Sequence, residues 1–201
     1  FDINGNVRNQ FFAFDEWGRE GINVSAGDVV GDSKDEIIVT SDKGGTGQVR
    51  IFNQYGHLQR AFYPFGRTSE PVHIAVGNMD DDSANEMIVT LGGNTEPLVK
   101  IFDANGRYVR GFTALNKNIR GLNIEVGDLD SDGYHEIIVS ADKGNSPMVG
   151  IYSRIGQVQQ NFFHYLLHFL FWMHIGNLFI VGYSSILIVC CFNCSGHLNY
   201  N

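Results

Sequence analysis

The stretch Gly127-Asp128-Leu129-Asp130-Ser131-Asp132-Gly133-Tyr134-His135-Glu136-Ile137-Ile138-Val139 decides how the rest of the chain is organised. Three aspartates stand at alternate positions, a glycine follows the third, and a glutamate closes the run where an apolar segment begins. Hard cations such as Ca²⁺ take roughly six to eight oxygen ligands, and alternating carboxylates in a tight loop point at one centre. The stretch therefore predicts a calcium site.

The ligands of this site follow from their positions in the loop. Gly133 permits the positive φ that so tight a loop needs. Four carboxylates this close would repel one another without a cation. The expected ligands are carboxylates at four positions and one backbone carbonyl: Asp128, Asp130, Asp132 and Glu136, with the carbonyl of Tyr134.

The same pattern occurs twice more, at a spacing of 50 residues, over 77–89 and 27–39. The second copy offers an amide carbonyl and three carboxylates: Asn78, Asp80, Asp82 and Glu86. The first copy offers only three carboxylates: Asp28, Asp32 and Glu36. Val30 stands where the first copy would need another aspartate, and Ser33 replaces the glycine. We therefore expect calcium in the second loop and a weak or vacant site in the first.

Composition excludes some classes of function. The net charge of −8 argues against nucleic-acid binding, which requires basic patches that neutralise phosphates. The three cysteines, Cys190, Cys191 and Cys194, all lie beyond the repeats, so the repeats have no disulfide framework. Gly-x-Ser-x-Gly is absent and the repeats suggest no Ser/His/Asp set. The sequence thus predicts a protein that is not an enzyme.

Each 50-residue unit is expected to form four short strands. The first alternates apolar and polar residues, and the second is a continuous apolar run that should be buried on both faces. The third leads through a hairpin at Gly56, Gly106 or Gly156 to a fourth that ends near Phe62, Phe112 or Phe162. Asn-Gly pairs, such as Asn4-Gly5, favour hairpins with a type I′ turn.

Four antiparallel strands per unit at this period are typical of one blade of a β-propeller. Residues 1–20 match the back half of a unit, and full units are expected at 21–70, 71–120 and 121–163. The fold class predicted is all-β: a partial, open β-propeller of about three blades with part of a preceding blade. Because the chain begins with Phe1 inside a unit, neighbouring blades of a longer parent chain are expected to pack on its apolar ends.

The units resemble FG-GAP/VCBS-type repeats, the blades of the integrin α-subunit head and of many bacterial surface proteins. The resemblance covers residues 1–163 and lies in Val/Ile-x-Val/Ala-Gly-Asp/Asn, the acidic loop, Glu-Ile/Met-Ile-Val and Val-x-Ile-Phe/Tyr. It implies a calcium-stabilised, non-catalytic segment of a secreted or cell-surface protein that binds a protein or carbohydrate ligand or serves adhesion. Two alternatives stay open: a fragment of a propeller enzyme acting on polysaccharide, and a purely structural spacer.

Residues 164–201 break the pattern. They contain no Asp, Glu, Lys or Arg, and 165–192 is almost wholly apolar. About 20 apolar residues suffice to span a bilayer as a helix, so a helical membrane anchor is one expectation for this tail. The other is a non-native segment produced by a frameshift, because the composition changes abruptly in the middle of a unit.

Overall fold

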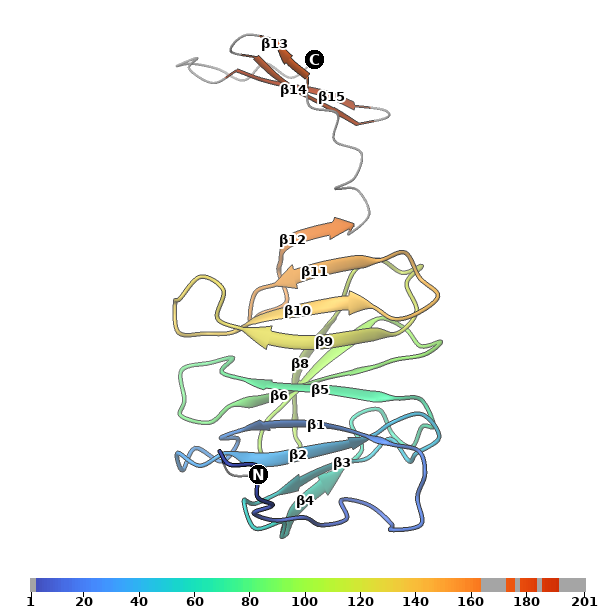
Figure 1. The fold of residues 1–201 in the computed structure, drawn as a ribbon, viewed down its shortest axis with the longest axis vertical. Helices are drawn as coiled ribbons and strands as arrows, with labels where there is room; N and C mark the ends of the chain where they lie inside the picture. The colour runs from blue at the N-terminus through green and yellow to red at the C-terminus, as the bar shows by residue number, and fades with distance from the viewer. Residues whose placement is uncertain (1–2, 164–172, 176–177, 184–185, 192–201) are drawn as a thin grey trace. The chain divides into compact units, whose positions relative to one another are not determined.

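The computed structural model describes residues 3–163, 173–175, 178–183 and 186–191 (Figure 1). The chain divides into two compact units, Phe1–Phe162 and Phe163–Asn201, which are described separately. Every regular element of the described residues is a β-strand. The all-β class predicted from the sequence is therefore confirmed.

The first unit contains three four-stranded antiparallel sheets, and in each the strands pair in chain order. The first sheet is β1 (Ile22–Gly27), β2 (Glu36–Ser41), β3 (Val49–Phe52) and β4 (Leu58–Phe62). The second is β5 (Val72–Gly77), β6 (Glu86–Leu91), β7 (Leu98–Phe102) and β8 (Tyr108–Thr113). The third is β9 (Leu122–Gly127), β10 (Glu136–Ala141), β11 (Met148–Tyr152) and β12 (Val158–Phe163). The four-strand unit is thus confirmed in all three copies.

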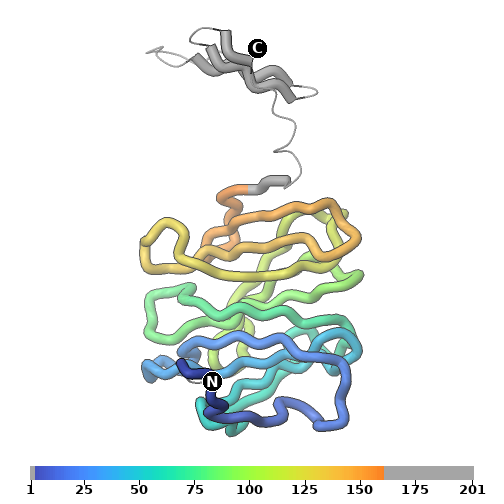
Figure 2. Tube along the Cα trace, viewed as in Figure 1, coloured from blue at the N-terminus to red at the C-terminus, as the bar shows by residue number. Residues whose placement is uncertain are grey.

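The three sheets lie side by side in chain order, with the first strand of each next to the first strand of its neighbour. β1 contacts β5 and β5 contacts β9, and the tube in Figure 2 follows this succession from blue through green to orange. Two apolar cores fill the spaces between the sheets. One contains Ile38 and Val72, the other Ile88 and Leu122, all fully buried. β6, in the middle sheet, is buried along its whole length because both of its faces are covered.

Two glycines permit the close approach of the first strands. A Cβ on Gly27 would lie 2.5 Å from Cγ1 of Val76, and one on Gly77 would lie 2.9 Å from Cγ2 of Val126. At the same place in the third sheet, a Cβ on Gly127 would meet nothing nearer than 3.9 Å. Neighbouring sheets therefore meet at a distance that excludes even a methyl group, and Gly127 faces open space.

A second repeated contact joins the outer parts of the sheets. Phe62 packs on Phe102 with ring centroids 5.2 Å apart, and Phe112 packs on Tyr152 at 4.9 Å. The first of each pair also lies over the hairpin glycine of the next sheet, since a Cβ on Gly106 would come within 2.8 Å of the Phe62 ring. Aromatic pairs of this kind contribute about 0.5–1.5 kcal/mol beyond the area they bury.

Residues 3–20 take part in this contact without forming strands. Phe11 packs on Phe52 at 4.9 Å and lies over Gly56, as Phe62 does over Gly106. The strands predicted here for a preceding blade are absent, so that prediction is wrong for the described residues 3–20. The reason is that no described strand lies beside them, and a lone hairpin is at best marginally stable.

The type I′ turn predicted for Asn-Gly is also wrong. Gly5 and Gly106 have φ of 81° and 71°, but neither Asn4 nor Asn105 has a positive φ. Gly106 N donates to Asp103 O, and Asp103 N donates to Arg107 O. The pairing register shifts between Ile101 and Phe102. One left-handed glycine beside a bulge therefore closes the hairpin, as in a three-residue loop.

Apolar side chains are uncovered at both ends of the row of sheets. Leu129 is 54% exposed, whereas Val29 and Met79, at the same position in the first two sheets, are 0% and 1% exposed. At the other end, Ile22 and Val24 are exposed, whereas Val72 and Ile74 are buried. The open apolar ends expected from the sequence are therefore present in the first unit.

The second unit contains β13 (Met173–Ile175), β14 (Leu178–Tyr183) and β15 (Ile186–Cys191), paired antiparallel in that order. The described part of the tail is thus strand, not the helix that was expected, because β-branched and aromatic residues favour strands. The remaining tail positions, 164–172 among them, lie outside the described residues. Among the residues described, no helix has the length and apolar character needed to cross a membrane.

Candidate metal site

The three acidic loops lie at the same end of neighbouring sheets. We call them loop 1 (28–35), loop 2 (78–85) and loop 3 (128–135); each joins the first and second strands of its sheet. Strand pairing sets Gly27 opposite Glu36, and the same pairing recurs in the other two sheets. One backbone hydrogen bond links each loop to the next: Asn85 N donates to Asp28 O at 2.7 Å, and His135 N donates to Asn78 O at 2.9 Å.

A buried glutamate closes each loop at the start of the second strand. Glu86 is 5% exposed and Glu136 is 4% exposed. One carboxylate oxygen of each is held by the loop, because Met79 N donates to Glu86 Oε2 and Leu129 N donates to Glu136 Oε2, both at 2.9 Å. The other oxygen of each carboxylate has no hydrogen bond within the described residues. Each of these two carboxylates therefore keeps one oxygen that a cation could bind.

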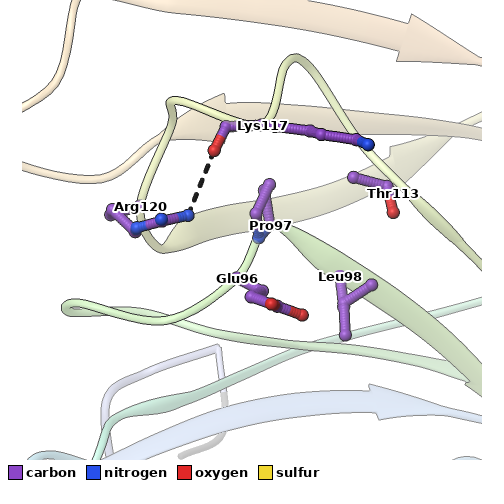
Figure 3. A pocket seen from close by; sticks show the side chains of 6 residues that line it. All are labelled: Glu96, Pro97, Leu98, Thr113, Lys117 and Arg120. Atoms are coloured by element: carbon purple, nitrogen blue, oxygen red, sulfur yellow. Dashed lines mark hydrogen bonds between the residues drawn. The ribbon is translucent and has the colours of Figure 1, made fainter.

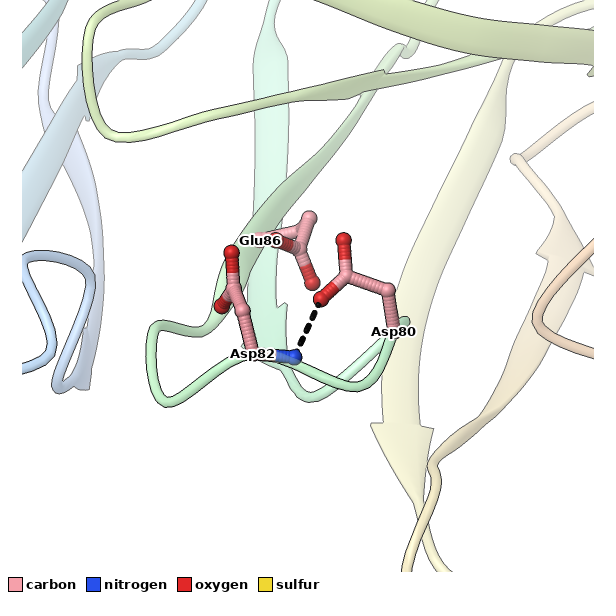
Figure 4. A group of neighbouring side chains, drawn as sticks. All are labelled: Asp80, Asp82 and Glu86. Carbon is pink, nitrogen blue, oxygen red and sulfur yellow. Dashed lines mark hydrogen bonds between the residues drawn. The ribbon is translucent and has the colours of Figure 1, made fainter.

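The carboxylates of these glutamates lie beside the loop aspartates. In loop 2, carboxylate oxygens of Asp80, Asp82 and Glu86 lie within 4.8 Å of one another, and Figure 4 shows the three groups facing one space. In loop 3, Asp128, Asp130 and Glu136 form a second group of this size, from the first, third and ninth positions of the pattern instead of the third, fifth and ninth. Two oxygens each about 2.4 Å from one Ca²⁺ ion can be no more than about 4.8 Å apart. Both groups therefore have the dimensions of a cation site.

Electrostatics of the second group favour a cation. Desolvation by burial raises the pKa of Glu86 from its ordinary value of 4.5 to about 7. The charges of Asp80 and Asp82 raise it further, against a hydrogen bond from Met79 N that lowers it. Near neutral pH the metal-free group therefore holds part of a proton, which a divalent cation would displace.

The side chains of three residues that were predicted to supply ligands make contacts within and between the loops. The carboxylate of Asp132 lies outside the group formed by Asp128, Asp130 and Glu136, and it accepts a hydrogen bond from Tyr134 N at 2.8 Å. Asn78 donates its Nδ2 to Gly133 O at 3.1 Å. Tyr134 donates its hydroxyl to the carboxylate of Asp81, and the guanidinium of Arg154 lies 4.0 Å above its ring.

Loop 1 does not bring its predicted ligands together. The carboxylate of Asp28 accepts hydrogen bonds from three backbone groups: Gly31 N at 2.7 Å, Asp32 N at 3.1 Å and Ser33 N at 2.6 Å. Desolvation acts to raise the pKa of Asp28, but these backbone donors together lower it below its ordinary value. Asp32 pairs with Lys34 at 3.0 Å. Both carboxylates thus have partners without a cation.

Glu36 differs from Asp28 and Asp32. Its Oε2 is buried and has no hydrogen-bond partner, and burial raises its pKa. Ser33 adopts a positive φ of 64° where loop 3 has Gly133. A non-glycine residue in this region costs about 1–2 kcal/mol. Among the described residues, loop 1 forms no cluster of three metal-binding groups, and the weak or vacant site expected there stays a prediction.

Several residues that shape these loops were missed by sequence reasoning. The role of Lys34 could have been predicted from the sequence, because a lysine two residues after Asp32 is within reach of its carboxylate. The contact between Asp81 and Tyr134 could not have been predicted from the sequence, since the two residues are 53 positions apart and belong to different loops.

A surface pocket of about 320 Å³ lies away from the acidic loops (Figure 3). Its lining combines one acid, two bases and apolar groups: Glu96, Pro97, Leu98, Thr113, Lys117 and Arg120. Arg120 Nη1 donates to Lys117 O at 3.1 Å, which fixes the guanidinium at the pocket rim. The charged groups that line this pocket are therefore one carboxylate, one ammonium and one guanidinium.

Comparisons with known proteins place the chain in no family. No family model matches it, and no curated protein does. Among solved structures, the crystal structure of the V. cholerae biofilm matrix protein Bap1 is similar with a TM-score of 0.36 and 17% identity. The match covers 70% of this chain and 28% of that chain, so the chain spans less than a third of that protein's length.

Proposed function

We propose that this chain is a calcium-stabilised segment of an open β-propeller, of the FG-GAP/VCBS type, in a secreted or cell-surface protein. Its role is adhesion or ligand binding without catalysis. One observation carries the proposal: Glu86 and Glu136 are almost fully buried, and each has a carboxylate oxygen close enough to those of two loop aspartates for a single cation to bind all three.

The arrangement of the sheets supports the propeller. Three four-stranded meanders of one repeat follow one another, and their first strands are neighbours. In a propeller, four-stranded sheets repeat around an axis and each sheet packs its face on the next. This arrangement leaves only short strand edges unpaired. The exposed Leu129 at one end and Ile22 at the other are the positions where further blades of a parent chain would pack.

The chemistry of the loops supports calcium and an extracellular setting. All the converging groups are carboxylates, which are hard ligands suited to Ca²⁺. Four of these groups, Asp80, Asp82, Asp128 and Asp130, are at least partly exposed, so the ion would keep water ligands and bind weakly. Extracellular calcium modules work at such affinities, with a Kd of about 10⁻⁴–10⁻³ M.

The binding role is favoured over the enzyme alternative by the regularity of the units. A propeller enzyme would carry catalytic residues in a loop that interrupts the repeat, and residues 21–163 keep a constant 50-residue spacing. The pocket lined by Lys117 and Arg120 is a candidate place for a carbohydrate or protein ligand. If the chain were a purely structural spacer, neither the pocket nor the exposed surface of loops 1 to 3 would bind a ligand.

The experiment is a glycan-array and cell-surface binding assay on the full chain, with calcium and with chelator. We expect retention on a carbohydrate or protein surface that is lost in chelator and weakened by Lys117→Ala/Arg120→Ala. Polysaccharide cleaved during the assay would favour the enzyme alternative. No retention on any surface would favour the spacer.

A further inference from the structure

Loop 2 and loop 3 are joined by side chains as well as by backbone. On the proposed function, which this inference requires, we propose that the two calcium sites are coupled: an ion in loop 3 raises the affinity of loop 2, and the reverse. The coupling passes through three hydrogen bonds, which we call the side-chain link. They are Asn78 Nδ2 to Gly133 O, Asn78 N to His135 Nδ1, and the Tyr134 hydroxyl to the Asp81 carboxylate.

Each member of the side-chain link is a neighbour of groups that would bind an ion. Asn78 begins loop 2, and its Oδ1 accepts from Asp80 N at 3.3 Å. Asp81 stands between Asp80 and Asp82 in the chain. On the other side, His135 directly precedes Glu136. Residues 133–135 therefore directly precede Glu136, a predicted ligand of loop 3, and also form hydrogen bonds to Asn78, the first residue of loop 2.

The contact between loop 1 and loop 2 provides an internal comparison. It contains the equivalent backbone bond, from Asn85 N to Asp28 O. Within the described residues, no side-chain hydrogen bond joins these two loops. Asn85, at the same loop position as His135, packs its side chain near Gly27. The side-chain link is thus particular to the two loops that form cation-sized groups.

Two effects act on the second ion with opposite signs. An ion in loop 3 reduces the negative potential that attracts an ion to loop 2, which opposes binding. Residues 133–135 are hydrogen-bonded to Asn78 and Asp81, so an ion that fixes this stretch would also fix part of loop 2 and leave less ordering to the second ion. The loops are largely exposed, and charge effects there are screened over about 8 Å at physiological salt. Ordering is not screened, so we infer net positive coupling that grows with ionic strength.

Calorimetric calcium titration of the full chain tests this. Asp130→Ala removes a ligand from the third group and should weaken calcium binding at loop 2 by about fivefold or more. Because coupling is reciprocal, Asp82→Ala should weaken loop 3 by the same factor. In an Asp81→Ala/His135→Ala background, which keeps every carboxylate of both groups, Asp130→Ala should leave the affinity of loop 2 unchanged.

Two further variants make the result specific. Asn85→Ala is the matched control, because it alters the same loop position as His135 without touching the side-chain link, and the coupling should persist. Tyr134→Phe removes a single hydroxyl and should reduce the coupling even if the double variant does not fold. Two ions bound with independent affinities would overturn this inference alone. No calcium binding at all would overturn the proposed function together with it.

Discussion

In saturating calcium, the first unit should unfold at a temperature roughly 10–20 °C higher than in chelator. An ion that binds only the folded loops stabilises by mass action, about 2.7 kcal/mol for each site when calcium is 100-fold above Kd. For a domain of this size, each kcal/mol raises Tm by about 2–4 °C. Two occupied loops therefore give a large effect. Scanning calorimetry of the full chain, with and without chelator, measures it.

Variants assign this stabilisation to particular loops. Asp130→Ala should remove at least half of the calcium-dependent rise, because one group loses a ligand and loop 2 binds its ion more weakly. Asp32→Ala is the matched control: its carboxylate pairs with Lys34 at the surface, where solvent screens the ion pair. The calcium-dependent rise should stay the same in that variant. An equal loss in both variants would mean that the loops do not differ as described.

Opposite effects are expected for one substitution made at two equivalent positions. Gly27→Ala should reduce the free energy of unfolding by about 1–3 kcal/mol, since its Cβ would lie 2.5 Å from Val76 and force the sheets apart. Gly127→Ala meets no neighbour closer than 3.9 Å. It should be neutral or stabilise by about 0.5–1 kcal/mol, because alanine loses less entropy in a strand.

Urea unfolding in chelator measures both glycine variants without a contribution from metal. Neither glycine has a positive φ, so backbone strain does not enter the comparison. Gly77→Ala should resemble Gly27→Ala, because its Cβ would lie 2.9 Å from Val126. Equal changes at Gly27 and Gly127 would contradict the packing of first strand on first strand.

The strands were predictable because each carries its own signal. Period-two alternation identifies β1, β5 and β9, and unbroken apolar runs identify β2, β6 and β10. Glycine at position 56, 106 or 156 marks each hairpin. The turn type could not be predicted from Asn-Gly alone, because the bulge beside it depends on the pairing of the flanking strands. Local patterns thus determine the elements and leave their detailed geometry to tertiary contacts.

The candidate site was predictable in its residue types but not in its exact membership. Alternating aspartates and a closing glutamate indicate a cation loop wherever they occur. Asp132 nevertheless lies outside its group, and loop 1 satisfies Asp28 and Asp32 with backbone donors and Lys34. These outcomes depend on the backbone conformation of each loop, which cannot be read from the residue types at single positions.

The tail also shows where the repeat pattern stops predicting the structure. Gly176 and Gly182 stand six residues apart, as Gly127 and Gly133 do, and a tyrosine follows the second glycine in both segments. Between them the tail has Phe179 and Val181 instead of aspartates. The structure there is the strand β14, not a loop. Residues 178–183 pair as an apolar strand, and the repeat pattern of residues 21–163 does not continue there.

The central claim is that loop 2 and loop 3 each hold one calcium ion and that loop 1 holds none. Equilibrium dialysis of the full chain against radiolabelled calcium, at concentrations across about 10⁻⁵–10⁻² M, counts the bound ions even at sites this weak. The account predicts two ions in the unaltered chain and one in each of Asp82→Ala and Asp130→Ala. A chain that carries no calcium under these conditions would contradict it, and so would three ions, since loop 1 would then be a site.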